Sequence, residues 1–511
     1  MQEKKIKPVS VLAFIVSVLV VLLIVAWIFP KEDIKITEDI SLKFISVKQI
    51  FNPKKQQTAD ITELLKNTDI ETTEENSTAF VEAPKPKLDS AIIDSQVIYY
   101  KPRKIRIDSV VQFLEFPKGQ KDILHAVYET MAELKNTGKL LRIMHYGDSQ
   151  IEQDRITNYF RFKMQQQFGG YGPGMVPAVK SFNFELPMSQ ESTGDWKRYT
   201  AFGRKDTTVK HDRYGVMATF ARFAPIEPDT SFRLSETELI TPAQTYKASL
   251  SFSKSRFAYS NTKKYSRCRM FLGNIKKELN ITVKSEEKTI EKKVIAPKEG
   301  LHTIAFHFNP APQKLTFEFE SIDSPEFYGF SFDTHKGIIV DNVAMRGSSG
   351  LMFTRMDLNL SAKIHRILGT KLLILQFGGN VVPMHKENYD FYARSFSYRL
   401  RTLKKIIPGV QIIVIGPSDM SKKEDDLYIT QPEVPLIRDA LKKAAFDNNC
   451  AFWDMYSAMG GKNSMPGWVF NDPPLGEKDF IHFTPKGAKY IAKLFYNAFI
   501  YDYNAYISKR K

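Results

Sequence analysis

Cysteine is scarce in this sequence, since only Cys268 and Cys450 occur among its 511 residues. Two cysteines cannot build a disulfide framework, and they are too few for a zinc site made of cysteine ligands. We expect both to be small buried hydrophobic residues, with a single bridge between them as the alternative. With 43% hydrophobic residues the chain is neither disordered nor collagen-like over most of its length, so it should fold around cores of its own.

Acidic residues are in the minority, because 57 Asp and Glu stand against 73 Lys and Arg and leave a formal net charge of +16. The excess is spread over the region after residue 100 rather than gathered in a block, which is typical of a solvated surface. Binding to an acidic glycan or to anionic headgroups is the functional alternative. No nucleic-acid recognition motif accompanies the charge, so we expect no nucleic-acid partner.

One long uncharged apolar run lies near the N-terminus. Residues 9–29 read VSVLAFIVSVLVVLLIVAWIF, which is long enough for a helix to cross a bilayer. A cleaved signal peptide would have a shorter apolar region, and a buried core helix would have a polar face. Lysines in the preceding tail, residues 1–8, favour a cytoplasmic N-terminus. We therefore expect a single-pass anchor in the inner (cytoplasmic) membrane, with the rest of the chain on the periplasmic or other extracytoplasmic side.

The next segment, residues 30–100, has mixed charges and little sustained periodicity. It contains the polar stretch TTEENST and the proline-bearing APKPK. We interpret it as a largely extended stalk or linker. Short apolar patches such as residues 42–50 are the exception, and could pair as strands or dock on the body.

A first polar turn follows an apolar strand at residues 140–150, LLRIMHYGDSQ, and precedes a helix-like stretch over residues 151–168. Strand, tight turn and helix would place Ser149 at the carboxyl edge of a parallel sheet, where ligands bind in open α/β sheets. A backbone N–H at the helix start can face developing negative charge there. Taken alone, the serine could be a helix cap or a turn residue. His145 is expected to be a strand residue.

Two further predicted strands end in glycines. Residues 371–380, KLLILQFGGN, end in Asn380, whose side-chain amide could point into the same crevice. Residues 337–350, GIIVDNVAMRGSSG, end in a glycine-rich loop in which the backbone of Gly347 can approach a ligand without a side chain in the way. Plain turn chemistry is the alternative for each.

The last polar group is the segment DFIHFTP at residues 479–485, before an amphipathic helix near the C-terminus. Thr484 is a suitable N-cap, so Asp479 and His482 should lie in the preceding loop. A carboxylate three residues before an imidazole can accept a hydrogen bond from one ring nitrogen, which leaves the other free to take a proton from a serine. Taken alone, His482 could be a surface or capping histidine.

Together these groups resemble the SGNH or GDSL hydrolase family, whose marker residues are serine, glycine, asparagine and histidine. The markers occur in the family's order as Ser149, Gly347, Asn380 and His482, with Asp479 three residues before the histidine. The resemblance implies that Ser149 is the nucleophile, that His482 is the general base and then the general acid, and that Asp479 orients the imidazole. It also implies an oxyanion hole made by the backbone amides of Ser149 and Gly347 and the side chain of Asn380. No metal or cofactor is implied.

The sequence departs from the family pattern at two positions. Gln150 stands where the family name has leucine, and Val381 stands where aspartate is common. Neither position carries the reaction, so the departures bear on the subfamily rather than on the catalysis.

About 190 residues separate Gly147 from Gly337, too many for a loop in a compact domain. Residues 185–333 alternate in strand fashion, which predicts an inserted β-sandwich. Helix-like and strand-like stretches then alternate again (388–405, 410–415, 434–447, 450–455). The catalytic domain is therefore expected to be discontinuous, 101–184 joined to 334–511, and the fold class to be α/β: an SGNH-like three-layer sandwich with a parallel sheet.

The resemblance extends to envelope polysaccharide O-acetylesterases of the peptidoglycan type, which can carry an insert similar to a carbohydrate-binding module at this place. Aromatic residues of the insert could stack on sugar rings, although we expect them in the core: Trp196, Tyr199, Phe257 and Tyr259.

The function that these expectations describe is a membrane-anchored, exported serine esterase that removes O-acetyl groups from a cell-envelope polysaccharide through an acyl-serine intermediate. One alternative is a polysaccharide O-acetyltransferase that uses the same triad and has a polytopic membrane acyltransferase as its partner. The others are a non-catalytic glycan-binding envelope protein and a lysophospholipase.

Overall fold

A computed structural model describes residues 7–28, 34–35, 41–42, 55–66, 104–182, 186–226 and 244–510. Most of the expected cytoplasmic tail and most of the expected stalk lie outside these ranges. The chain divides into two units, one made of residues 1–57 with 423–429 and the other of residues 58–422 with 430–511.

The smaller unit contains α1 (Pro8–Ile28), which coincides with the predicted anchor. Among the described residues it is the one helix that is long and apolar enough to cross a membrane, and none of its residues is buried. The short strands β1 (Ile34–Lys35) and β2 (Ser41–Leu42) pair antiparallel within the expected stalk.

The larger unit includes a short stretch of the expected stalk that docks on the body. The Ala59 amide donates a hydrogen bond to the carbonyl of Asn463 at 3.0 Å. Two apolar side chains of this stretch are buried: Ile61, just before α3 (Thr62–Lys66), and Leu64 within it.

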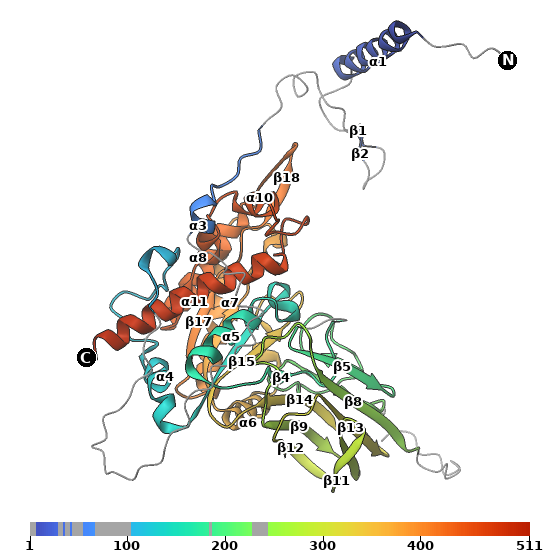
Figure 1. The fold of residues 1–511 in the computed structure, drawn as a ribbon, viewed down its shortest axis with the longest axis vertical. Coiled ribbons are helices and arrows are strands. Elements are labelled where there is room, and N and C mark those ends of the chain that lie inside the picture. Colours follow the sequence, from blue (N-terminus) through green and yellow to red (C-terminus); the bar gives the residue numbers. More distant parts are fainter. Residues whose placement is uncertain are drawn as a thin grey trace, which may run out of the picture. The chain divides into compact units, whose positions relative to one another are not determined.

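A parallel five-stranded sheet forms the centre of the larger unit (Figure 1). Its order is β15 (Gly337–Ala344), β3 (Leu140–Gly147), β16 (Thr370–Gln376), β17 (Gln411–Ile415) and β20 (Ala451–Trp453), and every neighbouring pair is parallel. The expected α/β class with a parallel sheet is thus confirmed, and the strand ends that carry the polar turns all lie at one edge.

Helices cover the sheet. Met144 and Tyr146 of β3 share one buried cluster with α6 (Leu358–Leu368), α7 (Asp390–Ile406) and α8 (Glu433–Asp447). The alternating residues Leu141 and Ile143 point to the opposite face and are fully buried too. A second group of helices packs together: α4 (His125–Thr137), α5 (Thr157–Phe168) and α11 (Pro485–Ser508).

Two antiparallel sheets account for the alternating region. One has the order β11 (Lys288–Ile295), β10 (Leu279–Ser285), β13 (Lys314–Ser321), β8 (Tyr246–Lys254) and β5 (Met188–Thr193). The other has the order β12 (Lys298–His307), β9 (Arg267–Ile275), β14 (Glu326–Asp333), β7 (Thr219–Arg222) and β6 (Lys197–Thr200), and β4 (Gly174–Val176) also pairs with β14.

Aromatic side chains from both antiparallel sheets fill one shared core. Phe252 and Phe317 of the first sheet lie against Phe330 of the second, with ring centroids 4.8 and 5.3 Å apart. Cys268 belongs to this core, and both cysteines are buried and free of any bridge. The two sheets thus share one core, which fits the β-sandwich expected from the alternation of polar and apolar residues.

A buried network of charges joins the parallel sheet to the second antiparallel sheet. Arg142 of β3 donates to Asp341 of β15 at 2.7 and 2.9 Å and to Asp333 of β14 at 3.0 Å. Arg269 and Arg267 of β9 also donate to Asp333, at 2.7 and 2.8 Å. Arg142 and both carboxylates are fully buried, so each charge depends on the others for its stabilisation.

Short elements complete the described chain, several of them at the carboxyl edge of the parallel sheet. They are η1 (Ile107–Ser109), η2 (Ser149–Asp154), η3 (Met352–Arg355), η4 (Gly379–Met384), β18 (Ser421–Glu424), β19 (Leu427–Thr430), α9 (Met455–Ala458) and α10 (Ser464–Val469).

Candidate active site

Ser149 lies directly beyond the carboxyl end of β3, at the first residue of η2. Glycine at residue 147 suits this close packing: a Cβ there would lie 3.0 Å from the carbonyl oxygen of Gln376 in the neighbouring strand and 2.9 Å from Cδ1 of Ile151. Asp148 then accepts a hydrogen bond from the amide of Gln150 at 3.0 Å and caps the turn. The expected helix starts later than predicted, at Thr157, because Gln153 has a left-handed backbone conformation.

His482 and Asp479 lie in the loop before α11, as predicted. Thr484 is the N-cap of that helix and accepts a hydrogen bond from the amide of Gly487 at 3.2 Å. The Oδ2 atom of Asp479 lies 2.6 Å from Nδ1 of His482, and Nε2 of His482 lies 2.8 Å from the Oγ atom of Ser149. The carboxylate, the imidazole and the hydroxyl thus form one continuous hydrogen-bonded chain.

The electrostatics of Asp479 favour this arrangement. Partial burial opposes the charge on its carboxylate, but the imidazole of His482 and the backbone amides of His482 and Ile481 outweigh that cost, so the pKa of Asp479 lies below its ordinary value. A charged Asp479 accepts the proton on Nδ1 of His482. Nε2 is then the acceptor for the hydroxyl proton of Ser149.

Asn380 lies in η4, immediately after β16. Its side-chain nitrogen donates to the carbonyl of Ser348 at 3.2 Å and to Oδ2 of Asp148 at 3.3 Å. Burial, the largest influence on Asp148, raises the pKa of this carboxyl to about 6. Above that pH the charged carboxylate is an acceptor that holds the Asn380 amide beside Ser149.

A cavity of about 200 Å³ brings these groups together. Ser149, Asn380 and His482 lie in its wall, and an apolar side is formed by Phe377, Pro383, Pro417, Met420 and Met455. Gly347 is not among the lining residues. It lies in an exposed turn next to Ser348, with a φ of 74° and open space where a side chain would be. The structure thus links Asp479, His482 and Ser149 by hydrogen bonds and places Asn380 in the same cavity as Ser149 and His482. Gly347 lies one residue from Ser348, whose carbonyl accepts from Asn380.

His145 is a strand residue, as predicted, and it does not line the cavity. Its ring lies between the side chains of Gln376 and Thr157, at 3.1 and 2.9 Å. Burial, which outweighs the hydrogen bond with Gln376, lowers the pKa of His145 to about 3, so the ring is neutral. Within the described ranges, no three His, Cys, Asp or Glu side chains gather as they would around a metal ion.

Gln150 is a site residue that sequence reasoning treated only as a departure from the family pattern. The side-chain nitrogen Nε2 of Gln150 donates to the carbonyl of Ile481 at 2.6 Å and to the hydroxyl of Ser418 at 3.0 Å. Gln150 is buried and lines the cavity. Gln150, the residue after Ser149, therefore holds the loop that carries Asp479 and His482 in position by a hydrogen bond.

We expect Gln150→Leu, which introduces the residue of the family name, to lower kcat about tenfold with little change in KM for an aryl acetate. The carbonyl of Ile481 loses its buried donor, and leaving such a group unsatisfied costs about 1–3 kcal/mol. Gln165→Leu is the matched control, because Gln165 is also buried and its amide also donates to one backbone carbonyl, that of Gly172, outside the cavity. Equal kcat values for the two variants would contradict a positioning role for Gln150.

Asp479→Asn should lower kcat by about 10²- to 10⁴-fold while the protein stays folded. The Oδ1 atom of Asp479 accepts hydrogen bonds from the amides of Ile481 and His482, at 2.9 and 3.0 Å. An asparagine would keep its oxygen there and turn its NH₂ group toward Nδ1 of His482. That contact favours the tautomer with the proton on Nε2, which cannot accept the proton of Ser149. Steady-state kinetics together with thermal unfolding measure both expectations, and unchanged kcat would exclude this role for the carboxylate.

No protein-family model and no curated protein matches the sequence. Among solved structures, a peptidoglycan O-acetylesterase is similar to this chain with a TM-score of 0.57 and 16% identity, over 76% of this chain and 97% of that chain. A family two carbohydrate esterase from Clostridium thermocellum matches with a TM-score of 0.22 and 8% identity, over 49% of this chain and 90% of that one. An acetyl xylan esterase matches with a TM-score of 0.24 and 17% identity, over 32% and 81% of the two chains. The TM-score of 0.57 shows that this chain shares the fold of that peptidoglycan O-acetylesterase.

Proposed function

We propose that this protein is an SGNH-type serine esterase that removes O-acetyl groups from a cell-envelope polysaccharide. The observation that carries the proposal is the chain of two short contacts from Asp479 through His482 to Ser149, 2.6 and 2.8 Å long, beside the amide of Asn380. Such a chain turns a weakly nucleophilic hydroxyl into one that can attack an ester.

In the proposed reaction the Oγ atom of Ser149 attacks the ester carbonyl while Nε2 of His482 takes its proton. The negative charge that forms on the carbonyl oxygen is proposed to meet the backbone amides of Ser149 and Gly347 and the side chain of Asn380. This requires Gly347 to approach the cavity, which it does not line, and one N–H of Asn380 to leave its present acceptor. Collapse of the tetrahedral intermediate breaks the bond to the sugar oxygen, which receives the proton from His482. Water activated by the same imidazole then cleaves the acyl-serine and releases acetate, and both proton and nucleophile return to their starting places.

The proposed cellular arrangement follows from the apolar helix α1 and from the similarity to a peptidoglycan O-acetylesterase. In it α1 anchors the protein in the cytoplasmic membrane as a single pass, with the N-terminus in the cytoplasm and the esterase on the extracytoplasmic side. The proposed catalytic domain comprises residues 101–184 and 334–511. The antiparallel sheets of residues 185–333 form an inserted β-sandwich in a carbohydrate-binding role.

The experiment that tests the proposal uses the detergent-solubilised full chain. Hydrolysis of aryl acetate and aryl octanoate is compared, and acetate release is measured from O-acetylated peptidoglycan and from acetylated xylan. We expect the acetate ester to react faster and at least one acetylated glycan to release acetate. Faster hydrolysis of octanoate with no acetate released from either glycan would overturn the proposal in favour of a lipid ester substrate, whereas an acetylated sugar product formed from an added acceptor would identify acyl transfer.

A further inference from the structure

A second, larger cavity opens on the five-stranded antiparallel sheet, with a volume of about 510 Å³. It lies at the start of the edge strand β5 and the end of β8, where Met188 pairs with Lys254. Its volume lies within the range of about 300–1,000 Å³ that is typical of ligand sites. We refer to it as the edge groove, and the lining residues used below are Lys180, Phe182, Glu191, Lys254, Arg256 and Phe257.

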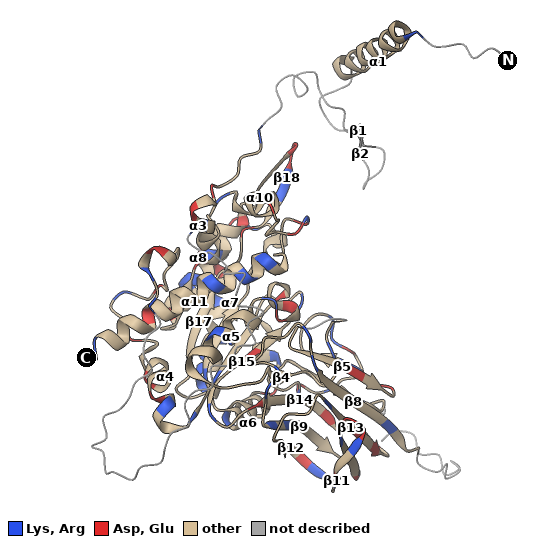
Figure 2. Cartoon of the chain, viewed as in Figure 1, with Lys and Arg blue, Asp and Glu red and all other residues tan. Residues whose placement is uncertain are grey.

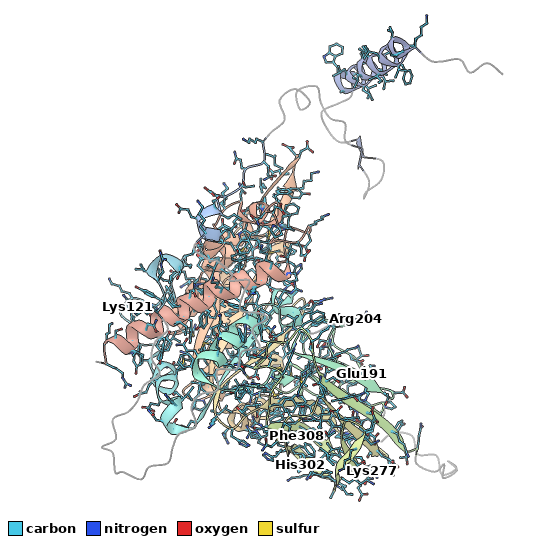
Figure 3. The ribbon with its side chains drawn as sticks, viewed as in Figure 1. Lys121, Glu191, Arg204, Lys277, His302 and Phe308 are labelled. Atoms are coloured by element: carbon cyan, nitrogen blue, oxygen red, sulfur yellow. The ribbon has the colours of Figure 1, made fainter. Side chains whose placement is uncertain are left out.

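Positive charge dominates the edge groove. Lys180 and Arg256 are exposed, and Lys254 is half-buried with one N–H donated to the carbonyl of Ala311 at 2.9 Å. Glu191, labelled in Figure 3, is the one acidic side chain among the described residues of the lining, and Lys314 lies 3.5 Å from it. Lys and Arg also occur on other elements, among them α11 (Figure 2), but in the edge groove they line a concave surface, which favours an anionic ligand.

An aromatic ring lies among these cations. Phe257 is 51% exposed, and the guanidinium group of Arg256 lies 4.5 Å from its ring centroid. The expectation that the aromatic candidates lie in the core is therefore wrong for Phe257. The other three are covered: Tyr199 is buried, Trp196 packs against the phenylalanine core, and Tyr259 stacks on Phe162 of α5 with ring centroids 4.3 Å apart. An exposed ring offers an apolar face to the C–H face of a pyranose, and adjacent cations offer partners for a carboxylate.

The wall of the edge groove is also connected to the active site. The guanidinium group of Arg346 lies 5.0 Å from the ring centroid of Phe182 and donates to both carboxylate oxygens of Glu152, at 2.6 Å each. Glu152 belongs to η2, the element that begins with Ser149, and Arg346 directly precedes Gly347. Phe182 is therefore common to the edge groove and to the charged contacts that border the nucleophile.

We propose that the edge groove binds a carboxylate-bearing segment of the same glycan chain whose acetyl ester is presented to Ser149. The proposal rests on the proposed function for its substrate and names the class of that substrate, an acidic pyranose polymer. A concave site with an exposed ring suits a sugar chain better than a flat anionic membrane surface, and the contact from Phe182 through Arg346 to Glu152 connects the groove wall to the element that begins with Ser149.

Binding is measured by isothermal titration with the solubilised full chain. The glycan ligands carry no O-acetyl esters, so none of them is a substrate of the proposed reaction. They are oligogalacturonate, peptidoglycan glycan strands with free stem-peptide carboxylates, neutral cello-oligosaccharide, and phosphatidylglycerol vesicles. The test variant is Lys180→Glu with Arg256→Glu. The matched control is Lys288→Glu with Lys292→Glu, which makes the same charge change at exposed positions of β11, the opposite edge of the same sheet.

We expect at least one of the two acidic glycans to bind, with an affinity that falls about tenfold or more in the test variant, falls in high salt and changes less than twofold in the control. Phe257→Ala should weaken the binding of the same ligand without changing the salt dependence of its affinity. Binding to neither acidic glycan, equal losses in the two charge-reversed variants, equal affinity for cello-oligosaccharide, or binding to the vesicles alone would each overturn the proposal.

A kinetic measurement separates this proposal from the proposed function. For an acetylated acidic glycan the test variant should show a raised KM and an unchanged kcat, with hydrolysis of aryl acetate at the wild-type rate. If the wild-type protein did not hydrolyse aryl acetate, the esterase proposal would be overturned, and the binding result would not be affected. An unchanged KM for the acidic glycan in the test variant would overturn the role of the edge groove in substrate capture.

Discussion

Ser149→Ala should lower kcat for an aryl acetate by about 10⁴-fold or more, which is the largest effect we expect of any single substitution. The change removes one oxygen atom and leaves the backbone amide of residue 149 in place. Nε2 of His482, now 2.8 Å from that oxygen, would have no hydroxyl to deprotonate. The measurement is the initial rate of ester hydrolysis, with circular dichroism and thermal unfolding to verify that the variant is folded.

Ser418→Ala is the matched control for that experiment. Ser418 is a second serine whose side chain lines the same cavity, but its hydroxyl accepts a hydrogen bond from Gln150 rather than lying against the imidazole. We expect its rate to stay within about tenfold of wild type, since only one hydrogen bond of about 0.5–1.5 kcal/mol is lost. Similar rates for Ser149→Ala and the wild type would remove Ser149 as the nucleophile, and with it the proposed mechanism.

The convergence of the site residues was predictable because of a topological rule. Ser149 and Asn380 each follow a short apolar run that ends in glycine, and the carboxyl ends of parallel strands meet at one edge. The loop with Asp479 and His482 was predictable from its helix cap. What the sequence could not reveal is the way in which this loop is held, because Gln150 and Ile481 lie 331 positions apart and no periodic pattern connects them.

The alternating segments of the antiparallel sheets were also predictable from the sequence. The pairing of the chain around residues 169–174 with its neighbouring strands was not. A run rich in glycine is typical of a loop, yet it ends at β4, which pairs with β14. The glycines are needed because the chain runs close to its neighbours. A Cβ at Gly170 would lie 2.3 Å from the carbonyl oxygen of Ile338, and one at Gly172 would lie 2.3 Å from that of Phe332. Close backbone approach of this kind depends on partners more than 150 positions away. In the sequence, the presence of glycine is its only sign.

Arg142→Met should destabilise the protein by about 3–5 kcal/mol, the cost expected when one member of a buried ionic network is removed. The substitution leaves the carboxylates of Asp341 and Asp333 without their shared donor, and both are fully buried. Because Arg142 lies on β3 and Asp333 on β14, the loss should weaken the connection between the parallel and antiparallel sheets. Arg106→Met is the control. Arg106 pairs with Asp108 on the surface, where ion pairs contribute little to stability, so we expect almost no change there.

The pH dependence distinguishes a lost ionic network from a lost packing contact. Burial opposes the charge on Asp333, but Arg142, Arg269 and Arg267 outweigh it and lower its pKa from 3.8 to about 2. A carboxyl with a lowered folded-state pKa stabilises the native state above its unfolded pKa, and that contribution is lost as the pH falls from about 4 toward 2. Urea unfolding across this window should therefore show a steeper loss of stability for the wild type than for Arg142→Met. Parallel pH curves for the two proteins would mean that Arg142 contributes by packing alone.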